Sequence, residues 1–277
     1  MKTFLEHQGH SQTVTPEDWH TEVAAIWRRR SESLRAIRHR DPVRFADLLG
    51  VEQQQAQLRQ NTERFLASQP CNHVLLWGSR GTGKSSLVKA LLNEYHPRGL
   101  RMIEVDRDDL ADLPYIVDHI RELDYRFIIF CDDLGFDQGD GSYRHLKSVL
   151  DGSLELPPDN VLLCATSNRR HLLPEYRQDN ADARLVEGEL HHSEAVEEKI
   201  SLADRFGLSL SFYPLDQQRY LQIIDHLLPE VVDHAALHIA ANRFALTRGV
   251  RSGRTARQFF NQFSGALPDI DVTDGWQ

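Results

Sequence analysis

Residues 78–85 place glycines, a lysine and a serine at the fixed positions of a P-loop. The glycines let the backbone curl so that successive N–H groups point toward a phosphate. Lys84 can then reach the β- and γ-phosphates, and Ser85 can ligate Mg²⁺. The pattern therefore predicts a nucleotide site with Mg²⁺. Its predicted cofactor-binding residues are Gly78, Ser79, Arg80, Gly81, Thr82, Gly83, Lys84, Ser85 and Ser86.

Two adjacent carboxylates, Asp132 and Asp133, follow the apolar run 126–131 and match a Walker B element. In such an element Asp132 faces Mg²⁺ through its water shell, and Asp133 faces the attacking water. We expect this strand to lie beside the strand that leads into the P-loop. An Asp-rich turn after a strand is the ordinary alternative, but its position downstream of a P-loop favours the catalytic interpretation.

Alternating apolar and amphipathic segments must position these groups. Short apolar runs predict strands near 73–77, 101–105, 126–131, 160–165 and 208–212, and helical stretches separate them. This alternation predicts an α/β fold in which helices flank a parallel five-stranded sheet. Helices only are expected around 216–228, 231–246 and 255–264. The expected parts are an N-terminal arm (1–40), an α/β nucleotide-binding domain (41–214), a helical lid domain (215–267) and an acidic tail (268–277).

The N-terminal arm combines an apolar stripe with arginines, and residues 17–40 read as helical. Packing of that stripe on the core or on a neighbouring subunit is the preferred interpretation. A nucleic-acid-binding patch is the alternative. A second unusual segment, 174–198, is a long polar connection, which is typical of functional or mobile loops.

The composition limits the class of protein. The 277 residues carry 32 basic and 41 acidic side chains, a formal charge of −9, which argues against nucleic-acid binding by general electrostatics alone. Cys71, Cys131 and Cys164 are isolated, which fits reduced thiols and a cytoplasmic protein. No leader is evident, and no apolar run approaches the roughly 18 residues that span a bilayer, so no membrane anchor is expected.

The apolar strand 160–165, followed by Thr166, Ser167 and Asn168, resembles sensor 1 of the AAA+ ATPases. That resemblance implies that Asn168 positions water near the γ-phosphate of ATP. A simple turn-forming asparagine is the alternative.

Two arginines complete the catalytic set that the AAA+ resemblance implies. The segment 201–208 resembles the one whose arginine reaches into a neighbouring subunit's nucleotide, so Arg205 would act in trans and the chain would self-associate. A surface arginine paired with Asp204 is the alternative. Segment 249–259 resembles the start of the sensor 2 helix, where we align Arg257 and keep Arg254 in reserve. A basic loop that binds nucleic acid would look alike.

Segment 45–52 resembles the AAA+ element that flanks the adenine ring, which implies a pocket wall made of Leu49, Gly50 and Val51. A helix start with buried leucines is the ordinary reading, and both can hold. No guanine-reading Asn-Lys-x-Asp segment follows the Walker B strand, so ATP is favoured over GTP.

The phrases at 72–78, 128–134, 165–172 and 195–200 together resemble the bacterial DUF815 family of predicted AAA+ ATPases, over residues 41–263. One departure from the broad AAA+ pattern is Asp133, where many members carry glutamate. Its shorter side chain suits slow turnover.

The resemblance implies an ATPase that couples ATP binding and hydrolysis to a conformational change acting on an unknown protein client. A slow or non-hydrolysing ATP-dependent switch, adaptor or loader is the alternative. A DNA-associated remodeller is possible but not favoured, because the net charge opposes it.

Overall fold

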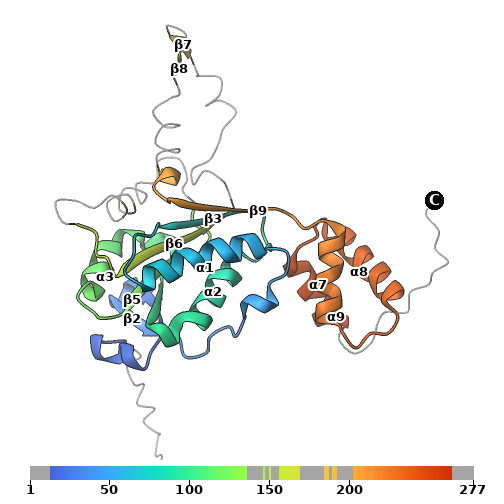
Figure 1. Cartoon of the computed structure of the whole chain (residues 1–277), viewed down its shortest axis with the longest axis horizontal. Coiled ribbons are helices and arrows are strands. Elements are labelled where there is room, and N and C mark those ends of the chain that lie inside the picture. The colour runs from blue at the N-terminus through green and yellow to red at the C-terminus, as the bar shows by residue number, and fades with distance from the viewer. Residues whose placement is uncertain are drawn as a thin grey trace, which may run out of the picture.

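The computed structural model describes residues 13–135, 156–168 and 202–263, together with residues 146 and 150 and the backbone of 184–186 and 189–191. Within these residues seven strands form one sheet, in the order β2-β1-β4-β5-β6-β3-β9 (Figure 1). The strands are β1 (Ala24–Arg28), β2 (Ser33–Ala36), β3 (Val74–Gly78), β4 (Leu100–Glu104), β5 (Arg126–Cys131), β6 (Val161–Ser167) and β9 (Leu208–Phe212).

The sheet is parallel except at one edge. All pairings from β1 through β4, β5, β6 and β3 to β9 are parallel, and only β2 runs antiparallel to its neighbour β1. The five strands expected from the apolar runs are all present, so the predicted α/β fold is confirmed. The sheet has seven strands where five were predicted, because β1 and β2 extend it.

The expectation of a helix over 17–40 is wrong. This segment forms a 3-10 turn η1 (Pro16–His20), then β1, a second turn η2 (Arg29–Ser31) and β2. Pairing of Ala24 with Met102 of β4 adds β1 to the sheet, and this tertiary pairing decides a short apolar run that fits either helix or strand. The arginines of 28–30 therefore stand at a turn and do not form a helical stripe. Residues 1–12 of the expected arm lie outside the described residues.

The expectation that the Walker B strand lies beside the P-loop strand is also wrong. β6 lies between them: Val74 of β3 pairs with Cys164 of β6, and Phe127 of β5 pairs with Val161 of β6. Chain order does not fix spatial order in a parallel sheet, because every connection crosses over and can skip a position. The acids of β5 therefore reach the P-loop across the end of β6.

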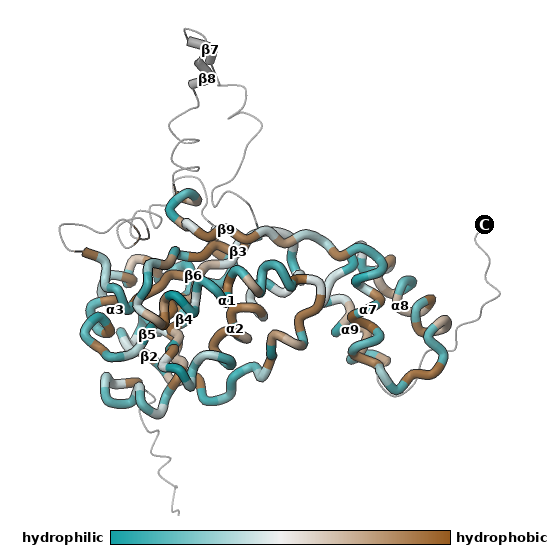
Figure 2. The backbone as a smooth tube through the Cα atoms, in the orientation of Figure 1, coloured by the Kyte–Doolittle hydropathy of each residue, from teal (hydrophilic) through white to brown (hydrophobic). Residues whose placement is uncertain are grey.

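Helices cover both faces of the sheet, whose strands are largely hydrophobic (Figure 2). Alternate residues of the strands belong to the two apolar cores, one on each face. α1 (Glu52–Leu66) and α2 (Lys84–Tyr95) pack on one face against side chains such as Leu76 and Ile128. α3 (Leu113–Ile120) packs on the other face against Ile103 and Ile129. The remaining 3-10 turns are η3 (Phe45–Asp47), η4 (His96–Arg98) and η5 (Arg107–Asp112).

After β9, the described residues form α7 (Gln217–Leu227), α8 (His234–Arg248) and α9 (Gly253–Phe263), called the helical unit below. The unit has its own apolar cluster, centred on Tyr220, Leu237 and Phe259, and it lies beside the sheet in Figure 1. Asp216 and Asp233 cap α7 and α8 by accepting backbone N–H bonds at 2.8 and 3.0 Å. These helices match those expected from the sequence. Residues 264–277, with the predicted acidic tail, lie outside the described part.

Only the backbone of a short hairpin is described within the long polar connection 174–198. Its strands β7 (Arg184–Val186) and β8 (Glu189–His191) pair antiparallel. The rest of the connection falls outside the described residues. Among the helices that the structure describes, none is long and apolar enough to cross a bilayer.

His73 joins three strands at the start of β3. Its Nδ1 accepts a hydrogen bond of 3.0 Å from the backbone N–H of Leu163, and its carbonyl accepts one of 3.1 Å from Leu208. Burial lowers the pKa of His73 to about 4 from an ordinary 6.5. The folded protein therefore holds the neutral imidazole, while the unfolded chain takes up a proton below pH 6.5.

We expect acid to destabilise the fold through His73. Its contribution is fully present above pH 6.5 and is lost as the pH falls toward 4, by up to roughly 3 kcal/mol. In His73→Asn, whose side-chain oxygen can still accept the Leu163 N–H, the free energy of unfolding should fall less over this range. Urea unfolding from pH 7 to pH 4 measures the difference, with His20→Asn at an exposed turn as control. Parallel pH profiles for wild type and His73→Asn would contradict the assignment.

Candidate nucleotide-binding and hydrolysis site

A cavity of about 920 Å³ opens at the carboxyl ends of the parallel strands, between the sheet and the helical unit. This is the edge of a parallel sheet at which ligands characteristically bind. Its wall includes most of the predicted site residues, and also Arg254. Those on the wall are Arg80, Gly81, Thr82, Gly83, Lys84, Ser85, Ser86, Leu49, Val51, Asp132, Asp133, Asn168 and Arg257.

Three of the predicted cofactor-binding residues, Gly50, Gly78 and Ser79, do not form part of this wall. Gly78 has another role at its position. Its φ is +131°, and a Cβ there would lie 1.9 Å from the carbonyl oxygen of Phe212, so only glycine lets β9 pair this closely. The carbonyls of Gly78 and Ser79 still contribute by accepting hydrogen bonds from Lys84.

Lys84 is the first residue of α2, and its ammonium lies inside the loop. Nζ donates to the carbonyls of Gly78 at 2.8 Å and Ser79 at 2.9 Å, and it lies 3.3 Å from Oδ1 of Asn168. Burial lowers the pKa of Lys84, while the charges of Asp133 and Asp132 oppose that shift. The loop therefore holds a buried cation at the N-terminus of a helix, an arrangement that favours a bound anion.

Asp132 joins the P-loop helix to the sheet. Its Oδ1 accepts hydrogen bonds from Ser85 Oγ at 2.6 Å and from Thr166 Oγ1 at 2.5 Å. The two predicted metal-binding residues, Ser85 and Asp132, are therefore in direct contact. A hydroxyl and a carboxylate are oxygen donors of the kind that Mg²⁺ prefers.

Asp133 is held in an unusual backbone conformation with φ +54°, which is uncommon for a residue with a side chain. Its N–H donates to Thr166 Oγ1 at 2.9 Å, and its Oδ1 accepts from Asn168 Nδ2. The second acid is thereby turned toward Asn168, while Asp132 is turned toward Ser85. Strained positions of this kind cluster at functional sites.

Thr166 was not singled out from the sequence, although it lies in the run that led to Asn168. It is almost fully buried, and its one hydroxyl accepts from the backbone of Asp133 and donates to the carboxylate of Asp132. The available signal was a hydroxyl residue at the end of a buried strand that follows the pair of acids along the chain.

Glu104 is a second residue that the sequence reasoning missed. It ends β4, the strand next to β5, and burial raises its pKa, with the charge of Asp132 adding to the shift. It lines a smaller cavity of about 280 Å³, which shares Asp41 and Lys89 with the larger one. An acid that directly follows or ends an apolar run, as Asp132 and Glu104 do, was the signal in the sequence.

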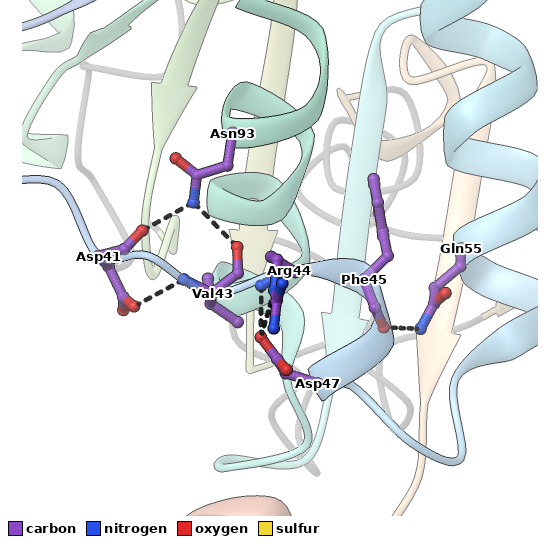
Figure 3. A network of polar contacts seen from close by, with 7 residues as sticks. All are labelled: Asp41, Val43, Arg44, Phe45, Asp47, Gln55 and Asn93. Atoms are coloured by element: carbon purple, nitrogen blue, oxygen red, sulfur yellow. Dashed lines mark hydrogen bonds and ion pairs between the residues drawn. The ribbon is translucent and has the colours of Figure 1, made fainter.

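The segment 41–51 forms one wall of the cavity, and α1 and α2 hold it in place (Figure 3). Asn93 of α2 donates to the carbonyls of Asp41 and Val43 at 2.7 and 2.9 Å. Gln55 of α1 donates to the carbonyls of Phe45 and Leu48 at 3.2 and 2.6 Å.

The predicted adenine-flanking residues continue this wall toward the helical unit. Val51 belongs to the core between the sheet, α1 and α2, whereas Leu49 packs against the cluster of the helical unit. Gly50 lies between them with φ +80°, and its N–H donates to Glu52 at 2.7 Å. The apolar end of the cavity is thus shared by the sheet and the helical unit.

Of the two sensor 2 candidates, Arg254 has the closer tie to the P-loop. Its backbone N–H donates to the carbonyl of Gly81 at 3.2 Å, and its charge contributes to the lowered pKa of Lys84. A Cβ on Gly81 would lie 2.9 Å from Ser252 Oγ, so this glycine admits the helical unit at close range. The guanidinium of Arg257 lies 5.5 Å from the Phe260 ring centroid, and this side chain also lines the cavity. Both arginines therefore line the cavity, and the assignment of Arg257 as sensor 2, with Arg254 in reserve, stays a prediction.

Arg205 is not part of the cavity wall of its own chain. In the sequence it stands between Leu202 and Phe206, which are both buried, and it precedes β9 by three residues; Arg205 itself is partly exposed. Its predicted action in trans stays a prediction.

Comparisons with known proteins concern both fold and family. The chain is similar to the RuvB Holliday junction branch migration motor of Thermotoga maritima, with 14% identity, a TM-score of 0.46, and coverage of 83% of this chain and 75% of that one. A single-site mutant of the same protein gives 14% identity, a TM-score of 0.48, and coverage of 80% and 73%. No curated protein sequence matches significantly.

The family comparison confirms the resemblance seen in the sequence. The family described as "Protein of unknown function (DUF815)" matches residues 20–267, which adds β1 and β2 to the region expected from the sequence. The chain belongs to the DUF815 family.

Proposed function

We propose that this protein is a cytoplasmic AAA+-type ATPase that binds Mg-ATP in the large cavity and hydrolyses it. The observation that carries the proposal is a continuous polar network. It joins the P-loop to the ends of β5 and β6 through Lys84, Ser85, Asp132, Thr166, Asp133 and Asn168. The buried free thiols of Cys131 and Cys164 support a reducing compartment.

Each residue of the network has a role that its position supports. The loop amides and Lys84 would bind the β- and γ-phosphates, and Ser85 and Asp132 would hold Mg²⁺. When bound, Mg²⁺ neutralises charge on the phosphate oxygens. Asp133 would accept the proton of the attacking water, and Asn168, which contacts both Asp133 and Lys84, would orient that water.

The apolar end of the cavity supports a purine base. Leu49 and Val51 face it from the segment before α1. Leu215 faces it from the segment before α7, and Ile223 and Leu227 face it from α7 itself. A flat aromatic ring would gain contacts from both sides at once. The base would therefore tie the helical unit to the sheet.

The helical unit is the element that we propose moves. It meets the P-loop through the backbone contact of Arg254 with Gly81, and it lines both the apolar and the polar end of the cavity. A γ-phosphate attracts Arg254 only before hydrolysis, so its loss would shift the equilibrium between closed and open positions. That change would act on a protein client.

A slow ATP-dependent switch or adaptor is the second candidate. The side chain of Asp133 is one methylene shorter than the glutamate of many AAA+ members, and its carboxylate already accepts a hydrogen bond from Asn168. A turnover slower than ATP dissociation would favour the switch over a motor.

Hydrolysis should depend on Asp133 and binding on Lys84. In Asp133→Asn we expect Mg-ATP affinity within a few fold of wild type and turnover reduced by about 10² or more, because the proton acceptor is lost. In Lys84→Ala we expect binding itself to fail. Calorimetry with Mg-ATP and a phosphate-release assay measure the two effects. Wild-type turnover in both variants would refute the proposed site.

Arg254 should matter more than Arg257. Removing a charge that faces the phosphates should weaken ATP more than ADP, because only ATP carries the γ-phosphate. We expect the ATP-to-ADP affinity ratio to fall by about tenfold in Arg254→Ala and to change little in Arg257→Ala. Competition binding with a fluorescent nucleotide gives the ratio. The reverse ranking would restore Arg257 as the sensor.

Arg205 is best tested by mixing inactive variants. Arg205→Ala should lose about 10³-fold in turnover if the guanidinium stabilises the transition state of a neighbouring site. A mixture of Arg205→Ala with Asp133→Asn should regain activity, because an intact site of the first variant meets an intact arginine of the second. If the mixture stays inactive although the two variants co-assemble, Arg205 does not act in trans.

A further inference from the structure

Three side chains with metal-binding chemistry meet at the turn between α7 and α8, away from the nucleotide cavity. Asp225 lies in the last turn of α7, and His234 and His238 lie in the first two turns of α8. Asp225 Oδ1 is 3.1 Å from His234 Nδ1 and 2.7 Å from His238 Nε2. One ligand atom from each residue falls within 4.8 Å of the other two.

The helical geometry explains why the imidazoles converge. Residues four apart lie one above the other on the same helix face, so His234 and His238 present two nitrogens to a common point. α7 supplies the third atom from the opposite side. Around a tetrahedral Zn²⁺, with bonds of about 2.0–2.2 Å, neighbouring ligand atoms are roughly 3.3 Å apart. The observed separations of 3.1 and 2.7 Å need only a small opening to accept such an ion.

We propose that Asp225, His234 and His238 bind a transition-metal dication of the Zn²⁺ class. Two imidazoles and one carboxylate suit this class better than Mg²⁺ or Ca²⁺, which prefer oxygen donors. The side chains are 37%, 55% and 32% exposed, so an ion can enter from solvent and water can fill the remaining position.

A hydrogen-bonded cluster without metal is the competing interpretation. In that case both imidazoles donate to one carboxylate oxygen, and such partly exposed contacts add little to stability. In metal binding the same nitrogens donate their lone pairs to the ion, and each ring proton sits on the other nitrogen. The two interpretations therefore differ in a measurable way: only metal binding gives saturable, metal-dependent stabilisation.

The position of the site gives it a consequence for the nucleotide cavity. α7 lines that cavity through Ile223, His226 and Leu227, whereas Asp225 projects from the opposite side of the same helix. A metal bound here would fasten the last turn of α7 to the start of α8. It would thus stiffen the wall that faces the nucleotide, although the metal site does not depend on nucleotide binding.

The test is a titration of the full-length chain, free of any affinity tag and of nucleotide, with Zn²⁺ and separately with Co²⁺. A large excess of Mg²⁺ occupies oxygen-donor sites such as Asp132. We expect one saturable site whose affinity falls more than about tenfold in both Asp225→Asn and His238→Gln, as expected when metal ligation is disturbed. His226→Gln, which removes the neighbouring imidazole on α7, should keep wild-type metal affinity.

Two further measurements distinguish binding at this specific site from binding by other histidines of the chain. Co²⁺ in a four-coordinate site gives intense visible absorption, and these bands should appear in wild type and vanish in His238→Gln. Zn²⁺ should raise the melting temperature of wild type and of His226→Gln but not of His234→Gln. Zn²⁺ and Co²⁺ binding that is absent in wild type, or equal in wild type and in Asp225→Asn and His238→Gln, would overturn the proposal. Circular dichroism shows that each variant is folded.

Discussion

Because β6 separates the P-loop strand from the strand that carries the two acids, backbone pairing cannot bring Ser85 and Asp132 together. Side chains at the end of the sheet have to span this distance. The hydroxyl of Ser85 does so by donating to Asp132 directly. Thr166, on the intervening strand, holds the acids in place with a single buried hydroxyl that contacts both Asp132 and Asp133. Its loss would remove one hydrogen bond from the carboxylate of Asp132 and the side-chain partner of the Asp133 backbone N–H.

The same constraint separates the roles of the two acids. Asp132 is drawn toward α2 by Ser85, whereas the positive φ of Asp133 turns the next carboxylate toward Asn168. Two identical side chains at neighbouring positions therefore meet different partners. The surrounding hydrogen bonds maintain the strained backbone that this requires.

Local patterns in the sequence predicted what local chemistry determines. Apolar runs such as 126–131 become strands because they are buried on both faces. The glycines at 78, 81 and 83 indicate the positive φ angles that the loop adopts there. The order of the strands, the role of Thr166 and the choice between Arg254 and Arg257 depend on contacts between distant segments. The strands β1 and β2 were missed for the same reason, since Ala24 becomes part of a strand through its pairing with Met102.

The N-terminal pair of strands also protects an edge. Without β1, the backbone of β4 would be the last of the parallel strands, with unpaired N–H and C=O groups along Leu100–Glu104. Such an edge is a template for pairing with another chain. A recombinant fragment that begins at residue 41 would expose it, so we expect such a fragment to aggregate even though it keeps every residue that lines the large cavity.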